Sequence, residues 1–446
     1  MHRRNFLKKA GLATAATIGM PYILPSGRLF AQTTSRMANH VVLVMFAGGV
    51  RMQESIGMQY LDGTQNEAIA GNIMYNMLDG TPPDDKIVYG TSGSRPGEIP
   101  IPAILNTPLQ RQGTTFREMQ ASLVGHFGGL NVALQGNTLL AQGLRQSPLH
   151  PTIFEYLRRH AGIPATKCWF VGNGIGGSIP LLNHSVHPDY GPQYAANFIA
   201  PSVTFGQEGF DHLSNAKNYH PEFELDPMYK MKLFLDNSFQ RAAQTIAGIG
   251  NTAEEKWEIK QFITEMFDKT ENDSVIQSPE IGLQGDLLTV GYACEVMKRF
   301  KPNLTVVNFN NVDSCHASFT GYLRALHRAD HGVGFLWDYI QREIPEMAND
   351  TIMMVMPECG RNLDPNPIRD ENNWFGFDHN DAHSRRIFGM MVGPNVPQDL
   401  AVGNENNPVG ISADAALTIA HIMGIRDQVG NAGLVNSNSR SLFDRI

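Results

Sequence analysis

Four mainly apolar runs, each followed by glycine or by polar residues, constrain the fold of this chain more than any other feature. They occupy residues 41–46, 304–309, 351–356 and 387–392. Apolar runs of this length are typical of strands that are buried on both faces of a parallel sheet. Helical patterns separate the runs along the chain, so the sequence predicts a three-layer α/β/α fold with a mostly parallel central sheet.

The segments between the runs have the periodicity of amphipathic helices. Such patterns cover residues 151–159, 228–246, 257–267, 283–300 and 319–344, and a further strand is predicted over 168–171. We place Pro151 in the first turn of the first helix, and Thr252 and Glu255 have the spacing of a capping box. We expect one α/β domain over 40–446, with 80–113 as a surface excursion and 226–270 as a candidate helical cap insertion.

Composition excludes several classes of protein. The 446 residues include 43 Asp and Glu against 35 Lys and Arg, a net charge of −8, which argues against a nucleic-acid partner. Hydrophobic residues make up 42% and charged residues 17%, so the chain can build a large core and is not disordered. No run approaches the roughly 18–20 apolar residues that a membrane span requires, so we expect no transmembrane span.

Residues 1–31 are predicted to be a signal for export. Arg3-Arg4-Asn5-Phe6-Leu7-Lys8-Lys9 precedes a weakly apolar segment that ends near Ala31, and this pattern resembles a twin-arginine signal. Its removal leaves 30 basic against 43 acidic residues, a net charge of −13. The resemblance implies that the protein is exported already folded, as proteins that often carry a metal or cofactor are, and that it is located in the periplasm or outside the cell.

The four cysteines predict neither a zinc ribbon nor a disulfide framework. They lie far apart in the chain and form no Cys-x-x-Cys pair: Cys168, Cys294, Cys315 and Cys359. One disulfide would be compatible with this spacing. In an exported protein of this size, however, we expect two or more of them to be buried free thiols.

The order of several motifs resembles that of the alkaline phosphatase superfamily, which includes phosphodiesterases, sulfatases and phosphomutases. In the first half, a strand ends at Gly48-Gly49 and is followed by the segments 115–126 and 151–158. In the second half, Asp330-His331-Gly332 begins a run that leads to 349–352 and to Glu358-Cys359-Gly360-Arg361. The resemblance extends from about residue 40 to 425 and is greatest to an exported branch of the superfamily.

This resemblance implies a site in which two divalent metal ions, zinc or similar, flank a Ser, Thr or modified Cys nucleophile. Thr115, ten residues before Gly125, matches the placing of the nucleophile, although a helix-capping threonine is the alternative interpretation. Glu118 falls near the position of an Asn that steadies the phosphoryl oxygen in relatives. A carboxylate at that position would repel an anionic substrate.

The resemblance assigns one metal site to Asp313, His316 and His379. Asp313 and His316 match the Asp and His of that site, with two intervening residues where several relatives have three. His379 matches the later His that completes the site, and His383 is its competitor. Imidazole and carboxylate ligands suit zinc and related divalent ions.

The second metal site departs from the superfamily pattern at two positions. Ala47 replaces the early Asp at the strand end, and the nearest downstream acid is Glu54. Glu358 and Cys359 replace the Asp-His pair, and Cys359 could bind zinc only as a thiolate. These departures put the two-metal mechanism in question.

Arg51 and Arg361 are candidate substrate-binding residues. Each follows a strand end and could bind an anion with two hydrogen bonds, or could serve as the partner of a structural ion pair. The sequence leaves these two roles open.

Three functions are compatible with these residues. The first is an exported metal-dependent hydrolase that acts on small phosphate or sulfate esters, with Thr115 as nucleophile. The second is a catalytically inactive relative that binds a protein partner in an extracytoplasmic assembly. The third is a site with one metal ion, in which Glu358 or Cys359 joins Asp313, His316 and His379.

Overall fold

The computed structural model describes residues 35–61, 68–82, 100–139, 147–173, 182–205 and 252–446. It also contains a short strand pair, β1 (Tyr22–Ile23) and β2 (Leu29–Phe30), and apart from this pair the expected signal segment 1–31 lies outside the described residues. The expected helix 228–246, most of the expected cap and residues 83–99 of the expected surface excursion also lie outside them. The assignment of 40–446 to one domain stays a prediction.

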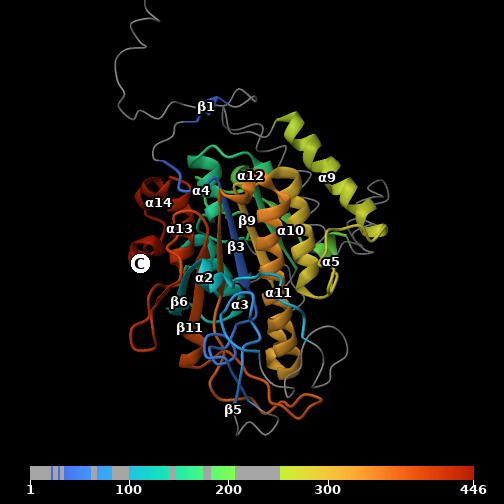
Figure 1. Ribbon diagram of the computed structural model, residues 1–446. Helices are drawn as coiled ribbons and strands as arrows, with labels where there is room; N and C mark the ends of the chain where they lie inside the picture. The colour runs from blue at the N-terminus through green and yellow to red at the C-terminus, as the bar shows by residue number, and fades with distance from the viewer. Residues whose placement is uncertain are drawn as a thin grey trace, which may run out of the picture.

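An eight-stranded sheet forms the centre of the molecule (Figure 1), and its strand order is β12-β6-β11-β10-β3-β9-β7-β8. Seven of these strands are parallel to one another, and only β11 runs in the opposite direction. The prediction of a mostly parallel sheet is therefore confirmed. In chain order the strands are β3 (His40–Phe46), β6 (Gly113–Gln120), β7 (Cys168–Gly172), β8 (Asn197–Ile199), β9 (Leu304–Phe309), β10 (Thr351–Pro357), β11 (Arg386–Val392) and β12 (Leu400–Val402).

Helices cover both faces of this sheet, as expected for a three-layer fold. A hydrophobic core lies on each face of the sheet, and alternate residues of β3 point into one or the other. Val42 and Val44 pack with the layer that contains α10 and α11, and Leu43 and Met45 pack with the layer that contains α3, α4 and α13. The helices of the first layer are α9 (Ala253–Glu271), α10 (Asp286–Phe300) and α11 (Phe319–Glu343), and those of the second are α3 (His126–Gln135), α4 (Ile153–His160) and α13 (Asp414–Ile422).

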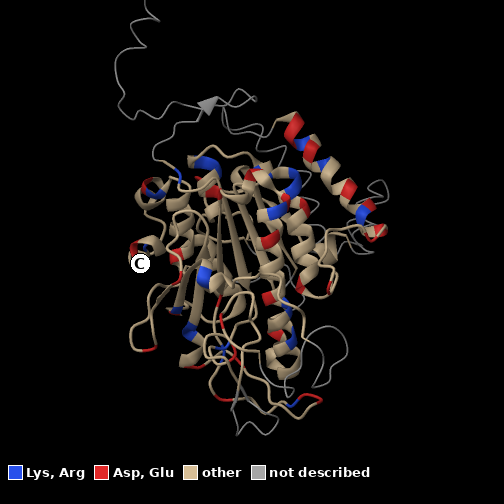
Figure 2. Ribbon diagram, in the orientation of Figure 1, with Lys and Arg blue, Asp and Glu red and all other residues tan. Residues whose placement is uncertain are grey.

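The remaining described strands and α-helices are short. They are the strands β4 (Gln59–Leu61) and β5 (Ala68–Ala70), which pair with each other, and the helices α2 (Leu109–Gln112), α5 (Pro201–Thr204), α12 (Pro345–Ala348) and α14 (Arg426–Ala432). Figure 2 shows charged residues along α9, whereas the central strands β3, β9 and β10 carry none. Among the described residues, no helix combines the length and the apolar character that crossing a bilayer requires.

Local sequence signals explain where two of these helices begin. The predicted capping box of Thr252 and Glu255 is present at the start of α9. A second capping box, formed by Thr152 and Glu155, starts α4, so Pro151 lies just before the N-cap and not in the first turn as predicted. The buried Glu155 carboxylate also accepts hydrogen bonds from Ser185 and from the backbone of Gly191, which fixes the loop beside α4.

The direction of β11 decides which residues meet at the functional edge of the sheet. Parallel strands bring their carboxyl ends to one edge, so the segments after β3, β6, β9 and β10 lie there. Because β11 is antiparallel to β6 and β10, it begins at this same edge. The segment that precedes Arg386 therefore lies at the same edge as the segments that follow the other strands.

Candidate functional site

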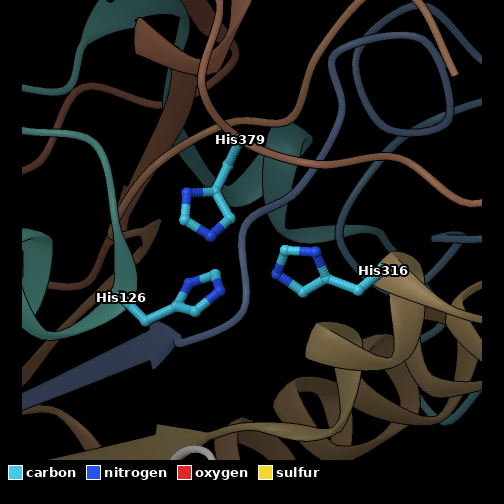
Figure 3. Close-up of side chains that lie close together, drawn as sticks. All are labelled: His126, His316 and His379. Atoms are coloured by element: carbon cyan, nitrogen blue, oxygen red, sulfur yellow. The ribbon is translucent and has the colours of Figure 1, made fainter. Parts of the chain in front are cut away.

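Three histidines from distant parts of the chain converge at this edge. His126 is the first residue of α3, His316 ends the short 3-10 helix η6 (Asn311–His316), and His379 lies in the segment before β11. Figure 3 shows the three rings grouped together, and their centroids are 4.3 Å (His126–His379), 5.0 Å (His316–His379) and 5.8 Å (His126–His316) apart. One nitrogen atom from each ring lies within 4.8 Å of the other two, so the three side chains can hold a metal ion.

Asp313 lies beside two of these rings. Its Oδ1 atom is 2.8 Å from His126 Nε2, 3.4 Å from His316 Nε2 and 2.8 Å from Arg361 Nη2. Burial on its own would raise the pKa of Asp313, but His126 and Arg361 outweigh it and hold that pKa well below its usual range. The carboxylate is therefore ionised and can act as an oxygen ligand.

Carboxylates on the far side of the rings fix the orientation of two histidines. Glu358 Oε1 lies 2.6 Å from His126 Nδ1, and Asp378 Oδ1 lies 2.8 Å from His316 Nδ1. Both contacts leave Nε2 directed towards Asp313. Histidine ligands of metal ions are commonly held in this way by a carboxylate on the other ring nitrogen.

Backbone and amide groups hold these carboxylates in turn. The N–H of Gly48 donates to Glu358 Oε1 at 2.7 Å, and the side-chain amide of Asn366 donates to Asp378 Oδ1 at 3.1 Å. The site is thus supported by contacts between the end of β3, the end of β10 and the loop before β11.

The histidines differ in their protonation. Burial, with His126, Arg361 and His316 nearby, lowers the pKa of His379 to about 4, so its ring is neutral near pH 7 and has a free lone pair. Burial would also lower the pKa of His126, but contacts with Asp313, Cys359 and Glu358 raise it to about 12. Without a metal ion His126 is therefore a cation, and metal binding would release its proton.

The donor set fits a divalent ion such as zinc. His126 Nε2 is buried and has no hydrogen-bond partner among the described residues, because its 2.8 Å contact with Asp313 lacks hydrogen-bond geometry. Imidazole nitrogens with a neighbouring carboxylate are the ligands that zinc prefers.

The structure brings together the three ligands predicted for the first metal site, Asp313, His316 and His379. The competitor His383 lies instead in the 3-10 helix η7 (Ala382–Arg385), where its Nδ1 is 3.5 Å from the guanidinium of Arg386. His383 is not a member of the cluster that the described residues form.

Glu358 and Cys359 lie at the buried side of the site. Together with His126 they form a second group whose ligand atoms are within 4.8 Å of one another. Burial and the neighbouring Glu358 raise the pKa of Cys359, which disfavours the thiolate that zinc would require. All four cysteines are free and buried, in agreement with the expectation of buried thiols.

Thr115 lies inside a strand of the sheet, and its side chain is buried. It lies inside β6, opposite Met390 and Ala401, five residues before the end of that strand. Its hydroxyl is buried and has no hydrogen-bond partner in the described part of the chain. The helix-cap interpretation is wrong because Thr115 is in a strand, and the nucleophile assignment stays a prediction. Glu118, in the same strand, forms an ion pair with Arg386 at 2.7 Å.

Both candidate substrate-binding arginines are buried in contacts within the protein. Arg51 Nη1 lies 2.5 Å from Glu54 Oε1, and its guanidinium lies 3.7 Å above the Phe377 ring. Arg361 donates to the backbone oxygens of Gly48 and Phe377 in addition to its contact with Asp313. In both cases the structural ion pair, the second of the two roles considered, is the one observed. Glu54 is thereby engaged and does not replace the acid missing at Ala47.

His126 is the candidate metal ligand that sequence reasoning missed. It follows Gly125 and lies six residues after the end of β6, so it obeys the same rule as Asp313 and Glu358: an ionisable residue soon after a strand end. Applying that rule to β6 would have found it.

No family model and no curated protein matches this chain. Solved structures do match it. They include a protein in the alkaline phosphatase superfamily from Vibrio parahaemolyticus, with 11% identity, a TM-score of 0.37 and coverage of 95% of this chain and 76% of that one. That superfamily is the one that the order of motifs resembles.

Two further matches are enzymes by their names. The sulfatase PsFucS1 from Pseudoalteromonas sp. is 12% identical, with a TM-score of 0.41 and coverage of 92% of this chain and 74% of that one. The phosphonate monoester hydrolase SpPMH from Silicibacter pomeroyi is 14% identical, with a TM-score of 0.33 and coverage of 75% and 70%. These are likenesses at low identity, and the chemistry proposed for this chain therefore depends on its own residues.

Proposed function

We propose that this protein binds one divalent ion, zinc or an ion of similar ligand preference, through His126, His316 and His379, and hydrolyses phosphate or sulfate esters there. The observation that carries the proposal is the convergence of the three imidazoles beside the ionised Asp313. Three histidines with an open position are a ligand set of catalytic zinc sites. Asp313 Oδ1 is a further oxygen donor within reach of the same ion.

The residues around the histidines have distinct tasks in this proposal. When bound, the ion would supply Lewis acidity to the ester group. Glu358 and Asp378 hold the His126 and His316 rings with Nε2 directed towards Asp313. Arg361 keeps the Asp313 carboxylate ionised and in place. Hydrolysis consumes one water, whose oxygen bonds to phosphorus or sulfur while the ester oxygen leaves with a proton.

Elemental analysis of the purified protein by plasma mass spectrometry tests the metal site, and a screen of phosphate and sulfate esters tests the activity. We expect about one equivalent of a divalent ion, and hydrolysis that is lost on chelation and restored by that ion. Asp313→Ala and His316→Ala should lower metal content and thermal stability together, because a bound ion stabilises the native state. Absence of metal after gentle purification, or metal content unchanged in the double variant, would show that the assignment is wrong.

A second function is favoured by the state of Arg51 and Arg361. Both guanidiniums are engaged inside the protein, and Ala47 supplies no ligand, so a superfamily-like anion clamp is missing among the described residues. In this alternative the protein is an inactive binding or structural component of an extracytoplasmic assembly, and any metal is structural. Metal binding without ester turnover, together with a specific protein partner in crosslinking of intact cells, would support it.

We also propose that the twin-arginine segment directs export and is removed near Ala31. The support is the sequence Arg3-Arg4-Asn5-Phe6-Leu7 and the weakly apolar segment after it. N-terminal sequencing of the protein from the periplasm tests this directly. Replacing both arginines by lysine should retain the precursor in the cytoplasm, and an exported double variant would contradict the proposal.

A further inference from the structure

A cavity of about 490 Å³ opens at the same edge of the sheet as the histidines. Its walls come from the segment after β6, from the end of η7 and from the C-terminal segment of the chain. The polar side chains that line it include Ser122, Thr138, Arg385, Asn436, Ser437 and Asn438. Its volume is in the range of small-molecule sites.

Arg385 is the one charged side chain among the described residues that line this cavity. Its Nη1 donates to the backbone oxygens of Ser122 at 3.1 Å and Ala121 at 3.4 Å. Neither Nε nor Nη2 has a hydrogen bond, and the guanidinium has no ion pair, within the described part of the chain. Arg385 is exposed to solvent in this polar cavity, so its guanidinium is accessible to a dissolved anion.

We propose that this cavity binds the anionic group of a small, hydroxyl-bearing ligand, such as a phosphate or sulfate group. Arg385 supplies the charge, and the hydroxyl and amide side chains supply donors and acceptors for neighbouring hydroxyl groups. Neutral apolar ligands are disfavoured because the polar side chains would lose their contacts with water.

Residues that line the cavity are close in sequence to two of the three histidines. Ser122 precedes His126 by four residues, which span at most about 14 Å, and Arg385 follows His379 by six residues. None of the three histidines lines this cavity, so we propose it as an anion site near the histidine cluster and not as part of that cluster.

The binding of inorganic phosphate and inorganic sulfate, measured by isothermal titration calorimetry on chelator-treated protein, tests the cavity independently of the metal. We expect Arg385→Gln to weaken anion binding roughly tenfold or more, since a charge-assisted contact is lost. The matched control is Arg299→Gln on α10, where the ion pair found among the described residues is a 4.0 Å contact with Glu258. This control should bind anions as the wild type does.

A second variant covers the case in which Arg385→Gln fails to fold, since Arg385 also holds two backbone oxygens. Asn438→Asp places a carboxylate in the lining while leaving Arg385 unchanged, and should abolish anion binding. Glucose 6-phosphate should bind more tightly than inorganic phosphate, and glucose should not bind. Equal anion affinity in wild type and Asn438→Asp, or no anion binding by the wild type, would overturn the proposal.

The outcomes separate this inference from the proposed function. Arg385-dependent anion binding in a protein that never contains metal would support the cavity and reject the metal site. A metal-loaded, active protein without Arg385-dependent binding would reject the cavity alone.

Discussion

His126 Nε2 lies 2.8 Å from Asp313 Oδ1, and yet the two atoms do not form a hydrogen bond of normal geometry. Both atoms are directed at the same region, where the rings of His316 and His379 also meet. Two potential metal-ligand atoms that approach each other without forming a hydrogen bond are suited to share a third partner. A metal ion in the proposed site would satisfy all of them.

Replacement of His126 is therefore expected to reduce metal binding. His126→Ala removes the buried nitrogen and should lower the metal content to well below one equivalent, measured by plasma mass spectrometry. His383→Ala is the matched control, because His383 is nearby in the chain before β11 but contacts Arg386 and not the cluster. Equal metal loss in both variants would contradict the ligand assignment.

Asp378 is expected to act on metal affinity through His316. Asp378→Asn weakens the contact that orients His316 Nδ1. Loss of such a supporting carboxylate typically lowers metal affinity 10–100-fold, and we expect a decrease of about tenfold here. Chelator competition measures the affinity, and the visible spectrum of the cobalt form reports ligand geometry. Asp364→Asn, on the exposed part of the same loop, should change neither.

The close contact between α3 and Glu358 leaves no room for a side chain at Gly129. A Cβ atom there would lie 2.5 Å from the backbone oxygen and 2.8 Å from the Cβ of Glu358. Gly129→Ala should destabilise the fold by about 1–3 kcal/mol and weaken metal binding by displacing Glu358. Gly430→Ala in α14, where nothing lies within 4 Å, should be neutral or stabilise by about 0.4–1 kcal/mol. Urea denaturation of the two variants measures the difference.

Asp330 is expected to make stability depend on pH. Burial raises its pKa to about 7, although N–H groups of Asn76 and Met77 oppose the shift. From about pH 4 to pH 7 the folded protein keeps a proton that the unfolded chain releases, so the contribution of Asp330 to the free energy of unfolding falls as pH rises. Above pH 7 it falls no further.

Asp330→Asn removes this titration. At pH 5 the variant should be less stable than wild type by about 1–3 kcal/mol, because its amide replaces an acceptor of the Asn76 and Met77 N–H groups. The difference should shrink between pH 5 and pH 8, as measured by denaturant unfolding at both values. A difference that grows with pH would contradict the assignment.

The four cysteines are expected to be unreactive in the folded protein. Burial raises the pKa of Cys168 and Cys315 to about 12, and all four side chains are buried. A thiol-specific chromogenic reagent should therefore detect no thiols in the native protein and four in denaturant. Two thiols in denaturant would indicate a disulfide.

Much of the architecture could be predicted because it depends on local patterns. The apolar runs of β3, β9 and β10 are long enough and continuous enough to identify buried parallel strands, and the periodicity of 319–344 identified α11 almost to its ends. The capping box at Thr252 is also a local signal, because each of its two side chains bonds a backbone group within one turn.

The direction of β11 could not be predicted, because an apolar strand has the same residue pattern in either direction. Its reversal brings His379 to the edge where His126 and His316 lie. The buried ion pairs of Arg51 with Glu54 and of Arg361 with Asp313 also depend on tertiary structure. A buried charged side chain needs an oppositely charged partner, and the fold decides which one lies within reach.

The sequence by itself determined that polar and ionisable residues follow buried strands, and hence that Asp313, His316 and Glu358 would gather at one edge of a parallel sheet. Only the tertiary structure decided that His126 joins them, that Arg51 and Arg361 are held inside the protein, and that Arg385 lines a separate cavity. The physical reason is that strand periodicity is encoded over a few neighbouring residues. The partners of a charged side chain depend instead on distances between segments up to hundreds of residues apart.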